Sequence, residues 1–262
     1  MIIDSHQHAF SDIAAQIALN RSAGLTKSIL FPTRVHPEIA TSLGEFTREF
    51  EMLKRNLAGG AIVADTFIRA IDETADAVAH HPEDFSGFGI CPVGMSEQDT
   101  AQWIETHITG KGLSGIGEVT FTPGNATSIE PIIRYLHETG GVLPVWVHTF
   151  NPATLRDIED LVSLGVKYPS AKIVLGHGGG YHWLETLSMT KDKPNLWIDL
   201  SAQFSVLPVK YFAQEIPDRT LFSSDLPFGD PEIGIVTLRK VISDRSVLEK
   251  VLHENAARLI GI

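Results

Sequence analysis

Cysteine is almost absent from this chain of 262 residues, which contains Cys91 alone. A single thiol cannot form an intramolecular disulfide, so a disulfide-stabilised secreted scaffold is excluded and we expect a reduced, cytoplasmic protein. No apolar run approaches the roughly 18 residues of a membrane span, and no basic segment followed by a long apolar run precedes the first apparent strand. We therefore expect no membrane partner.

Basic residues are also scarce, because 21 Lys and Arg stand against 32 Asp and Glu, which gives a formal charge of −11. Such a balance repels the phosphate backbone of nucleic acids and the surface of anionic membranes. We expect a small-molecule substrate as the main partner, and we leave open whether copies assemble into a homo-oligomer. With 43% hydrophobic and 20% charged residues, the composition is that of a globular protein.

Short apolar runs alternate with amphipathic segments along the whole chain. The eight runs cover residues 2–5, 28–31, 87–93, 113–119, 143–147, 172–175, 196–201 and 220–223. Strands separated by helices predict parallel pairing with right-handed crossovers, and eight is the number that closes a (β/α)8 TIM barrel of the metal-dependent hydrolase type. An open doubly wound sheet is the alternative, although the Gly-rich fingerprint that usually follows its first strand is missing.

Helical patterns fill the segments between these runs. They cover residues 12–23, 42–57, 61–80, 96–108, 129–139, 152–168, 181–189, 208–215 and 231–260, and Pro152 is expected at the first helical position of its helix. The stretch 37–81 is too long for one crossover helix and contains Gly59-Gly60 between two amphipathic halves. We therefore expect a single domain over residues 1–262, with a helical cap within residues 37–81.

His6 and His8 stand one residue apart in the first run. Side chains at positions i and i+2 of a strand share a face, so both imidazoles can reach one metal ion. A barrel of this kind builds its active site where the strands end. Further residues able to bind a metal or transfer a proton stand at or just after the ends of later runs, namely Glu118, His148, His177 and Asp225.

Nitrogen and oxygen ligands without any cysteine ligand are typical of a catalytic metal site with an open position rather than of a closed structural zinc site. We expect one Zn²⁺, with Mn²⁺ as the alternative. A metal of this kind lowers the pKa of a bound water toward ~7. The pattern therefore predicts an enzyme.

Together these motifs resemble the amidohydrolase superfamily of metal-dependent (β/α)8 barrels, in particular its amidohydrolase-related branch. The resemblance implies that His6, His8, His148 and Asp225 bind the metal and that Asp225 accepts a proton from the metal-bound water. It also implies that His177 completes the site or steadies the oxygen on which negative charge develops. The likeness covers Asp4-Ser5-His6-Gln7-His8, Val147-His148, Leu175-Gly176-His177-Gly178-Gly179, Ser223-Ser224-Asp225 and Asn255-Ala256-Ala257-Arg258-Leu259.

Glu118 adds an alternative to a site with one metal. The segment Gly115-Ile116-Gly117-Glu118-Val119 resembles that of TatD-type deoxyribonucleases, in which the glutamate is a metal ligand. The other interpretation is a glutamate that orients a ligand histidine without touching the metal. We slightly favour direct contact. Neither the fourth nor the fifth run ends in lysine, so a metal pair bridged by a carboxylated lysine is not expected.

Five further residues near the expected mouth are candidates for substrate contacts. Arg34 and His36 follow the second run, where an arginine could hold a substrate carboxylate with two hydrogen bonds. Phe150, Trp183 and Phe228 follow later runs and could form an apolar wall.

The leading functional hypothesis is a metal-dependent hydrolase that acts on a small carboxylated or cyclic amide, ester or lactone. The same branch contains non-oxidative decarboxylases, which are the alternative, and CO₂ release without incorporation of water would identify one. A TatD-like nuclease with two metals and a non-catalytic metal-binding scaffold are the remaining hypotheses. The acidic balance of the chain argues against the nuclease.

Overall fold

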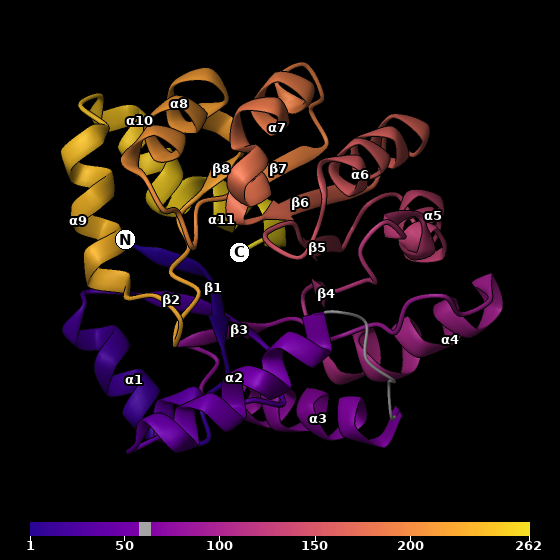
Figure 1. The fold of residues 1–262 in the computed structure, drawn as a ribbon, viewed down its shortest axis with the longest axis horizontal. Helices are drawn as coiled ribbons and strands as arrows, with labels where there is room; N and C mark the ends of the chain where they lie inside the picture. Colours follow the sequence, from indigo (N-terminus) through magenta and orange to yellow (C-terminus); the bar gives the residue numbers. More distant parts are fainter. Residues whose placement is uncertain (58–63) are drawn as a thin grey trace.

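The computed structural model describes residues 1–57 and 64–262. Its eight strands are all parallel and follow one another in chain order, the first three in one sheet and the other five in a second (Figure 1). The strands are β1 (Ile3–His8), β2 (Lys27–Phe31), β3 (Phe85–Gly87), β4 (Ile116–Val119), β5 (Pro144–His148), β6 (Lys172–Gly176), β7 (Leu196–Asp199) and β8 (Thr220–Leu221).

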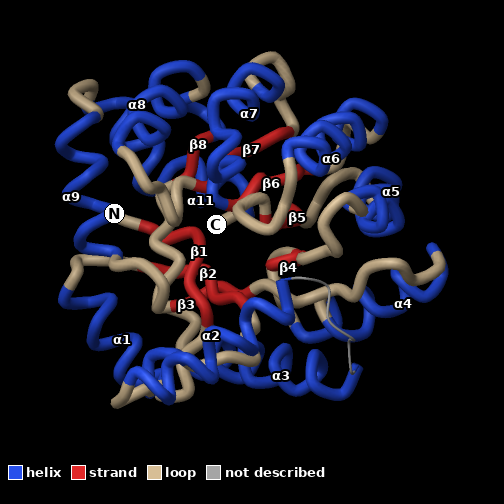
Figure 2. The backbone as a smooth tube through the Cα atoms, viewed as in Figure 1, coloured by secondary structure: helices blue, strands red, loops and turns tan. Residues whose placement is uncertain are grey.

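Isolated contacts link the two sheets at both ends and complete the ring. Gly89, just after β3, forms a parallel bridge with Ile116 of β4, and Gln7 of β1 forms one with Leu226, beyond β8. The strands therefore occupy the middle of the molecule with helices around them (Figure 2). Sequential order around a ring confirms the (β/α)8 expectation over the doubly wound sheet, in which the first strand would lie inside the sheet.

Helices connect the strands, and most of them lie around the outer side of the ring. They are α1 (Ile13–Ser22), α2 (Leu43–Leu57), α3 (Ala64–His80), α4 (Glu97–His107), α5 (Glu130–Glu138), α6 (Leu155–Lys167), α7 (Trp183–Thr190), α8 (Val206–Glu215), α9 (Pro231–Val241), α10 (Arg245–Glu249) and α11 (Asn255–Ile260). The predicted break at Gly59-Gly60 between α2 and α3 lies outside the described residues. No helix in the described ranges combines the length and apolar character needed to cross a membrane.

Three sequence expectations about element boundaries are wrong. Helix α6 starts at Leu155 instead of Pro152, because Thr154 and Asp157 form a reciprocal capping box. The long helix expected over 231–260 is interrupted after Val241, and Asp244 caps a new helix by accepting from Ser246 and Val247. Strand β3 covers Phe85–Gly87, earlier than the apolar run 87–93 suggested, because its first residue pairs with Ser28.

Strand alternation sorts the core into two layers. On β5, Val145 and Val147 pack outward in the large cluster shared with the helices, whereas Trp146 packs inward. Phe31 and Phe88 join Trp146 there, with ring centroids 5.0 to 5.8 Å apart, so the ring interior is filled. Because inward positions recur every second residue, the residue two beyond Trp146 must also face inward. That residue is His148, at the end of β5.

Candidate metal centre

The six ligand-type residues predicted from the strand ends come together at one end of the ring. They are His6 and His8 on β1, Glu118 on β4, His148 on β5, His177 directly after β6 and Asp225 after β8. Five of them line one cavity of about 510 Å³, and His6 lies beneath it with no exposed surface. We call this space the metal-centre cavity.

His6, His8 and Asp225 form a first group of potential ligands. The Nε2 atom of His8 lies 3.3 Å from Oδ1 of Asp225, and Nε2 of His6 lies 3.7 Å from the same oxygen. One ligand atom from each of the three residues lies within 4.8 Å of the other two. Such spacing allows all three to bind a single ion.

Glu118, His148 and His177 form a second group with the same property. Oε1 of Glu118 lies 3.1 Å from Nδ1 of His148 and 3.2 Å from Nε2 of His177. These two nitrogens are themselves 3.1 Å apart. The other carboxylate oxygen of Glu118, Oε2, lies 3.9 Å from Nε2 of His6, so Glu118 faces both groups.

Irregular backbone aims these side chains inward. The pairing of β1 with β2 shifts register between Asp4 and Gln7, and that bulge changes the alternation so that His6 and His8 contact Phe31 of the inner layer. A second shift, between Ile116 and Val119 of β4, brackets Glu118.

Positive φ angles place the two ligand-type residues that follow strands. His177 has φ 60° and Asp225 has φ 61°, a region that non-glycine residues rarely occupy. The Asp225 amide donates to the carbonyl of His6 at 2.8 Å, and the Asp225 carbonyl accepts from Phe228 at 2.7 Å. These bonds hold the carboxylate of Asp225 beside β1.

Asp199, at the end of β7, is a functional residue that sequence reasoning missed. Its Oδ2 lies 2.7 Å from Nδ1 of His6 and accepts from the Trp146 indole at 2.9 Å. Because Asp199 holds Nδ1, Nε2 of His6 is directed toward the cavity, an arrangement common behind metal-binding histidines. The available signal was an aspartate closing the apolar run Leu-Trp-Ile-Asp, at a strand end like the others.

Ser201 supports His177 in a similar way. Its hydroxyl lies 2.8 Å from Nδ1 of His177, which leaves Nε2 of that ring for the second group. Sequence reasoning did not single out this serine, since a hydroxyl after a strand carries little signal alone.

The electrostatics of the site favour bound positive charge. Burial alone would lower the pKa of His6, but the hydrogen bond that it donates to Asp199 and the charges of Glu118, Asp199 and Asp225 raise it to about 10. The pKa of His177 also rises, because Glu118 and nearby aspartates outweigh its burial. Burial would raise the pKa of Glu118, yet the neighbouring histidines hold it well below its usual range. These carboxylates therefore attract positive charge to the site.

The donor set fits a divalent cation. Nε2 of His6, the atom that faces Glu118 and Asp225, is buried and has no hydrogen-bond partner among residues 1–57 and 64–262. Leaving a buried nitrogen unpaired is costly, and a metal ion is the partner that imidazole and carboxylate groups at these distances accept. The residues present therefore match the expected cofactor.

The candidate substrate residues divide between this cavity and other places. Phe150 and Phe228 line the metal-centre cavity. Trp183 lies outside its lining and stacks on Tyr211, with ring centroids 6.3 Å apart. Arg34 also lies outside it and covers the ring of Phe67, with its guanidinium carbon 4.5 Å from the centroid.

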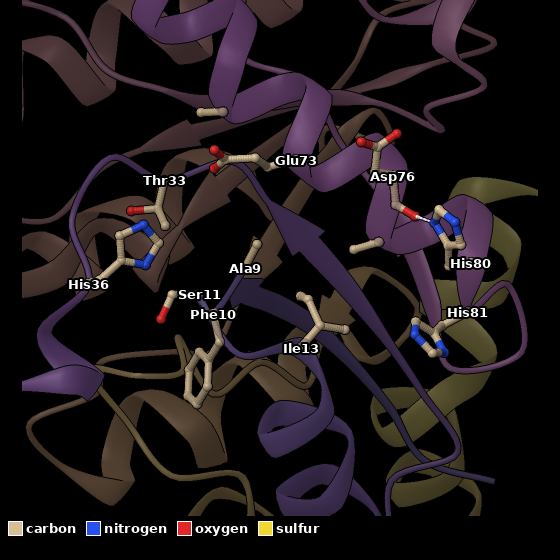
Figure 3. Close-up of a pocket in the computed structure, with 12 residues that line it drawn as sticks. Ala9, Phe10, Ser11, Ile13, Thr33, His36, Glu73, Asp76, His80 and His81 are labelled. Carbon is tan, nitrogen blue, oxygen red and sulfur yellow. Dashed lines mark hydrogen bonds between the residues drawn. The ribbon is translucent and has the colours of Figure 1, made fainter.

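His36 belongs to a separate cavity of about 540 Å³ between the loops after β1 and β2 and helix α3 (Figure 3). Its Nδ1 lies 3.0 Å from Oε1 of Glu38. Figure 3 shows the His36 ring beside Thr33, with Glu73 of α3 across the space.

Helix α2 supplies lining residues that sequence reasoning did not name. Phe50, Leu53, Lys54 and Leu57 line the metal-centre cavity. Their spacing of three, four and seven residues puts them on one face of the helix. Of the described lining residues, Lys54 alone is a lysine or arginine, and it pairs with Glu51 on the same helix. The periodicity could have identified this face, but not what it covers.

Comparisons with known proteins agree with this geometry. The model of a family described as "Amidohydrolase" matches residues 3–262. No curated protein sequence gives a significant match.

Solved structures extend the likeness over whole chains. An uncharacterised TIM-barrel protein from Bordetella bronchiseptica has a TM-score of 0.74 and 14% identity, over 99% of this chain and 98% of that one. A putative amidohydrolase from Staphylococcus aureus has a TM-score of 0.72 and 15% identity, over 100% and 99%. A dihydroxybenzoic acid decarboxylase from Polaromonas, solved with manganese and 2-nitroresorcinol, has a TM-score of 0.71 and 18% identity, over 99% and 96%. At identities this low, the structural likeness shows a shared fold and nothing more.

Proposed function

The chain belongs to the amidohydrolase family, and from this premise we propose that it is a hydrolase that uses two divalent cations on a small ester, amide or lactone. One observation carries the proposal: the two oxygens of Glu118 face two different groups of ligand-type side chains. A carboxylate shared by two adjacent three-ligand groups is suited to bridging a pair of metals.

Each side chain has a definite role in this proposal. His6, His8 and Asp225 would hold one cation, His148 and His177 the other, and Glu118 would bind both. Cations held there would supply Lewis acidity for activating water and polarising the carbonyl of the substrate. Asp225 accepts the proton from the attacking water on its carboxylate and then delivers it to the leaving group. Asp199 and Ser201 keep two of the imidazoles correctly oriented.

The rest of the cavity supports a small, partly apolar substrate. Phe50, Leu53, Phe150 and Phe228 surround its outer part, while Lys54 offers one positive charge there. An anionic group on the substrate could lie near Lys54 with its apolar body against the phenylalanines. Helix α2 would then act as the cap expected within residues 37–81.

A second candidate function is a non-oxidative decarboxylase. Solved decarboxylases favour it, since a 5-carboxyvanillate decarboxylase from Sphingomonas paucimobilis and the Polaromonas enzyme share this fold over nearly all of both chains. The aromatic residues in the cavity would also suit a benzoic acid. In that reaction a proton is added where the carboxylate leaves, and no water oxygen enters the product.

One experiment separates the two candidates. The protein is loaded with Zn²⁺ or Mn²⁺ and screened against esters, amides, lactones, hydroxybenzoic acids and one phosphodiester, in oxygen-18-labelled water with CO₂ detection. Label in the organic product supports the hydrolase. Release of CO₂ together with an unlabelled organic product supports the decarboxylase, and label in the CO₂ itself is ignored because CO₂ exchanges its oxygens with water. Cleavage of the phosphodiester alone would instead identify a nuclease.

Metal analysis tests the cation pair directly. In place of the single ion expected from the sequence, we expect about two tightly held ions per chain with the better of the two metals. The reason is that Glu118 lies between the group of His6, His8 and Asp225 and its own group with His148 and His177. The comparison of Zn²⁺ with Mn²⁺ also identifies the more active ion. One ion per chain at full activity would contradict the bridging role of Glu118.

A further inference from the structure

A third cavity, of about 390 Å³, lies between the segments that follow β7 and β8, bounded by helices α8 and α9. Ala202 and Phe228 line both this cavity and the metal-centre cavity. The two spaces are therefore neighbours that share a wall on the side of the ring where the strands end. Loops on that side form the substrate sites of (β/α)8 enzymes.

Gln203 lines this cavity, and its hydrogen bonds fix the orientation of its side-chain amide. Its amide nitrogen donates to the carbonyl of His177 at 2.8 Å and to that of Ser201 at 2.9 Å. Carbonyl oxygens only accept, so these two bonds settle which end of the amide is nitrogen. The amide oxygen, Oε1, is buried and has no partner among the described residues.

Ser223 adds a second polar group without a partner. Its side chain is 4% exposed, it lines the same cavity, and its hydroxyl has no hydrogen-bond partner in the described part of the chain. The next residue, Ser224, is a useful contrast because its hydroxyl donates to Asp4. An unpaired buried hydroxyl costs stability and calls for a ligand that pairs with it.

The remaining lining defines the chemistry of that ligand. Among residues 1–57 and 64–262, no lysine, arginine or histidine lines the cavity, so no described side chain there would balance an anionic group. The one carboxylate, on Asp230, accepts from the Ile233 amide at 3.0 Å as the cap of α9. Most other lining side chains are apolar, including Val209 and Leu238. An uncharged group with a hydrogen-bond donor, such as a primary amide or a hydroxyl on an apolar body, matches these features.

We propose that this cavity is a distal substrate subsite that binds an uncharged amide- or hydroxyl-bearing part of the substrate through Gln203 and Ser223. The inference rests on the proposed function, because the reacting group would lie in the metal-centre cavity while this part passes Phe228. Gln203 and Ser223 are then specificity-determining residues. An anionic group of the substrate would instead bind in the metal-centre cavity, near Lys54.

Binding of benzamide to the full-length protein tests the subsite without any turnover. Benzamide carries a primary amide on an apolar ring, and its dissociation constant can be measured by ligand-observed NMR with and without metal. We expect Ser223→Ala to weaken binding about three- to tenfold, the effect of one neutral hydrogen bond. The melting temperature should not fall, because the hydroxyl has no partner to lose.

Ser163→Ala is the matched control, since this distant hydroxyl is exposed and bonds only within its own helix. Equal benzamide affinity in the Ser223→Ala and Ser163→Ala variants would overturn the proposal. So would the absence of measurable binding to wild type, or binding that disappears when the metal is removed, which would place benzamide at the metal centre.

A second measurement links the cavity to catalysis. For a substrate found in the screen, an analogue with an added primary amide should show a lower KM in wild type but not in Ser223→Ala, with kcat little changed. An analogue that gains nothing in wild type would show that the cavity does not serve this reaction. If the screen finds no substrate, the proposed function fails, while benzamide binding still decides the cavity.

Discussion

The floor of the metal-centre cavity consists of His6, Trp146 and Asp199, which are buried and joined by hydrogen bonds. Its rim on α2 is different, because no residue of that helix is buried. Phe50 of the rim is 41% exposed, whereas His6 is fully buried. The residues beneath the ligand groups are therefore part of the packed core. The side chains of α2 that face the outer part of a substrate can be substituted with little loss of folding stability.

Removing a ligand from the floor should have the largest effect. We expect His6→Ala to lose at least one metal and more than about 10⁴-fold in kcat/KM, because activation of water depends on the cation. Metal content by elemental analysis and steady-state kinetics check this together. His80→Ala, an exposed histidine of α3, is the control and should keep both. Full activity of His6→Ala with its metal gone would remove the basis of the proposed mechanism.

Asp225→Asn tests the proton-transfer role separately from metal binding. Turnover should fall about 10²- to 10⁴-fold, the usual contribution of a general base, while metal affinity falls much less. The measurement is kcat of the variant after saturation with metal. Comparable turnover in this variant and wild type would show that Asp225 is only a ligand.

Asp199→Asn probes the support beneath His6. The Trp146 indole, the Ser201 amide and Nδ1 of His6 all converge on this carboxylate, so an amide group there must face at least one donor. We expect a 10- to 100-fold loss of metal affinity or activity, typical of residues that orient a ligand. Metal titration measures it, and Asp192→Asn on the surface is the control. An unchanged metal affinity would show that Asp199 is not needed to hold His6 in position.

The smallest effect is expected at the rim. Phe50→Ala should raise KM about three- to tenfold through lost apolar contact and leave kcat and the melting temperature nearly unchanged, since the ring is only partly buried. Leu43→Ala on the same helix is the control, because Leu43 is 81% exposed and does not line the cavity. A fall in melting temperature of more than a few degrees would show that α2 is part of the core.

The sequence predicted the ring and the six ligand-type residues because strand alternation and strand ends follow simple periodic rules. It did not predict the two groupings around Glu118, because these depend on bulges in β1 and β4 that no periodicity reveals. Arg34 shows the same limit for loops. Its position after β2 suggested the mouth, but stacking on Phe67 directs it elsewhere.

The sequence also could not predict contacts between residues that lie far apart along the chain. Gln203 and His177 are 26 residues apart, and the unpaired oxygen of Gln203 emerges only from the packed structure. Cys91 is a different case, because burial raises the pKa of its thiol and so disfavours the reactive thiolate.

The bridge between Gln7 and Leu226 has a consequence for how the protein is made. The ligand group of His6, His8 and Asp225 takes two residues from the first eight and its third from position 225, so the ribosome must deliver most of the chain before that group exists. His6 and His8 of β1 are synthesised first and lack their third ligand until the later strands are made. Closing so long a loop is also slow, because it costs chain entropy. Metal uptake would therefore report that synthesis and ring closure are both finished, and an excess of the ion would stabilise only the completed product.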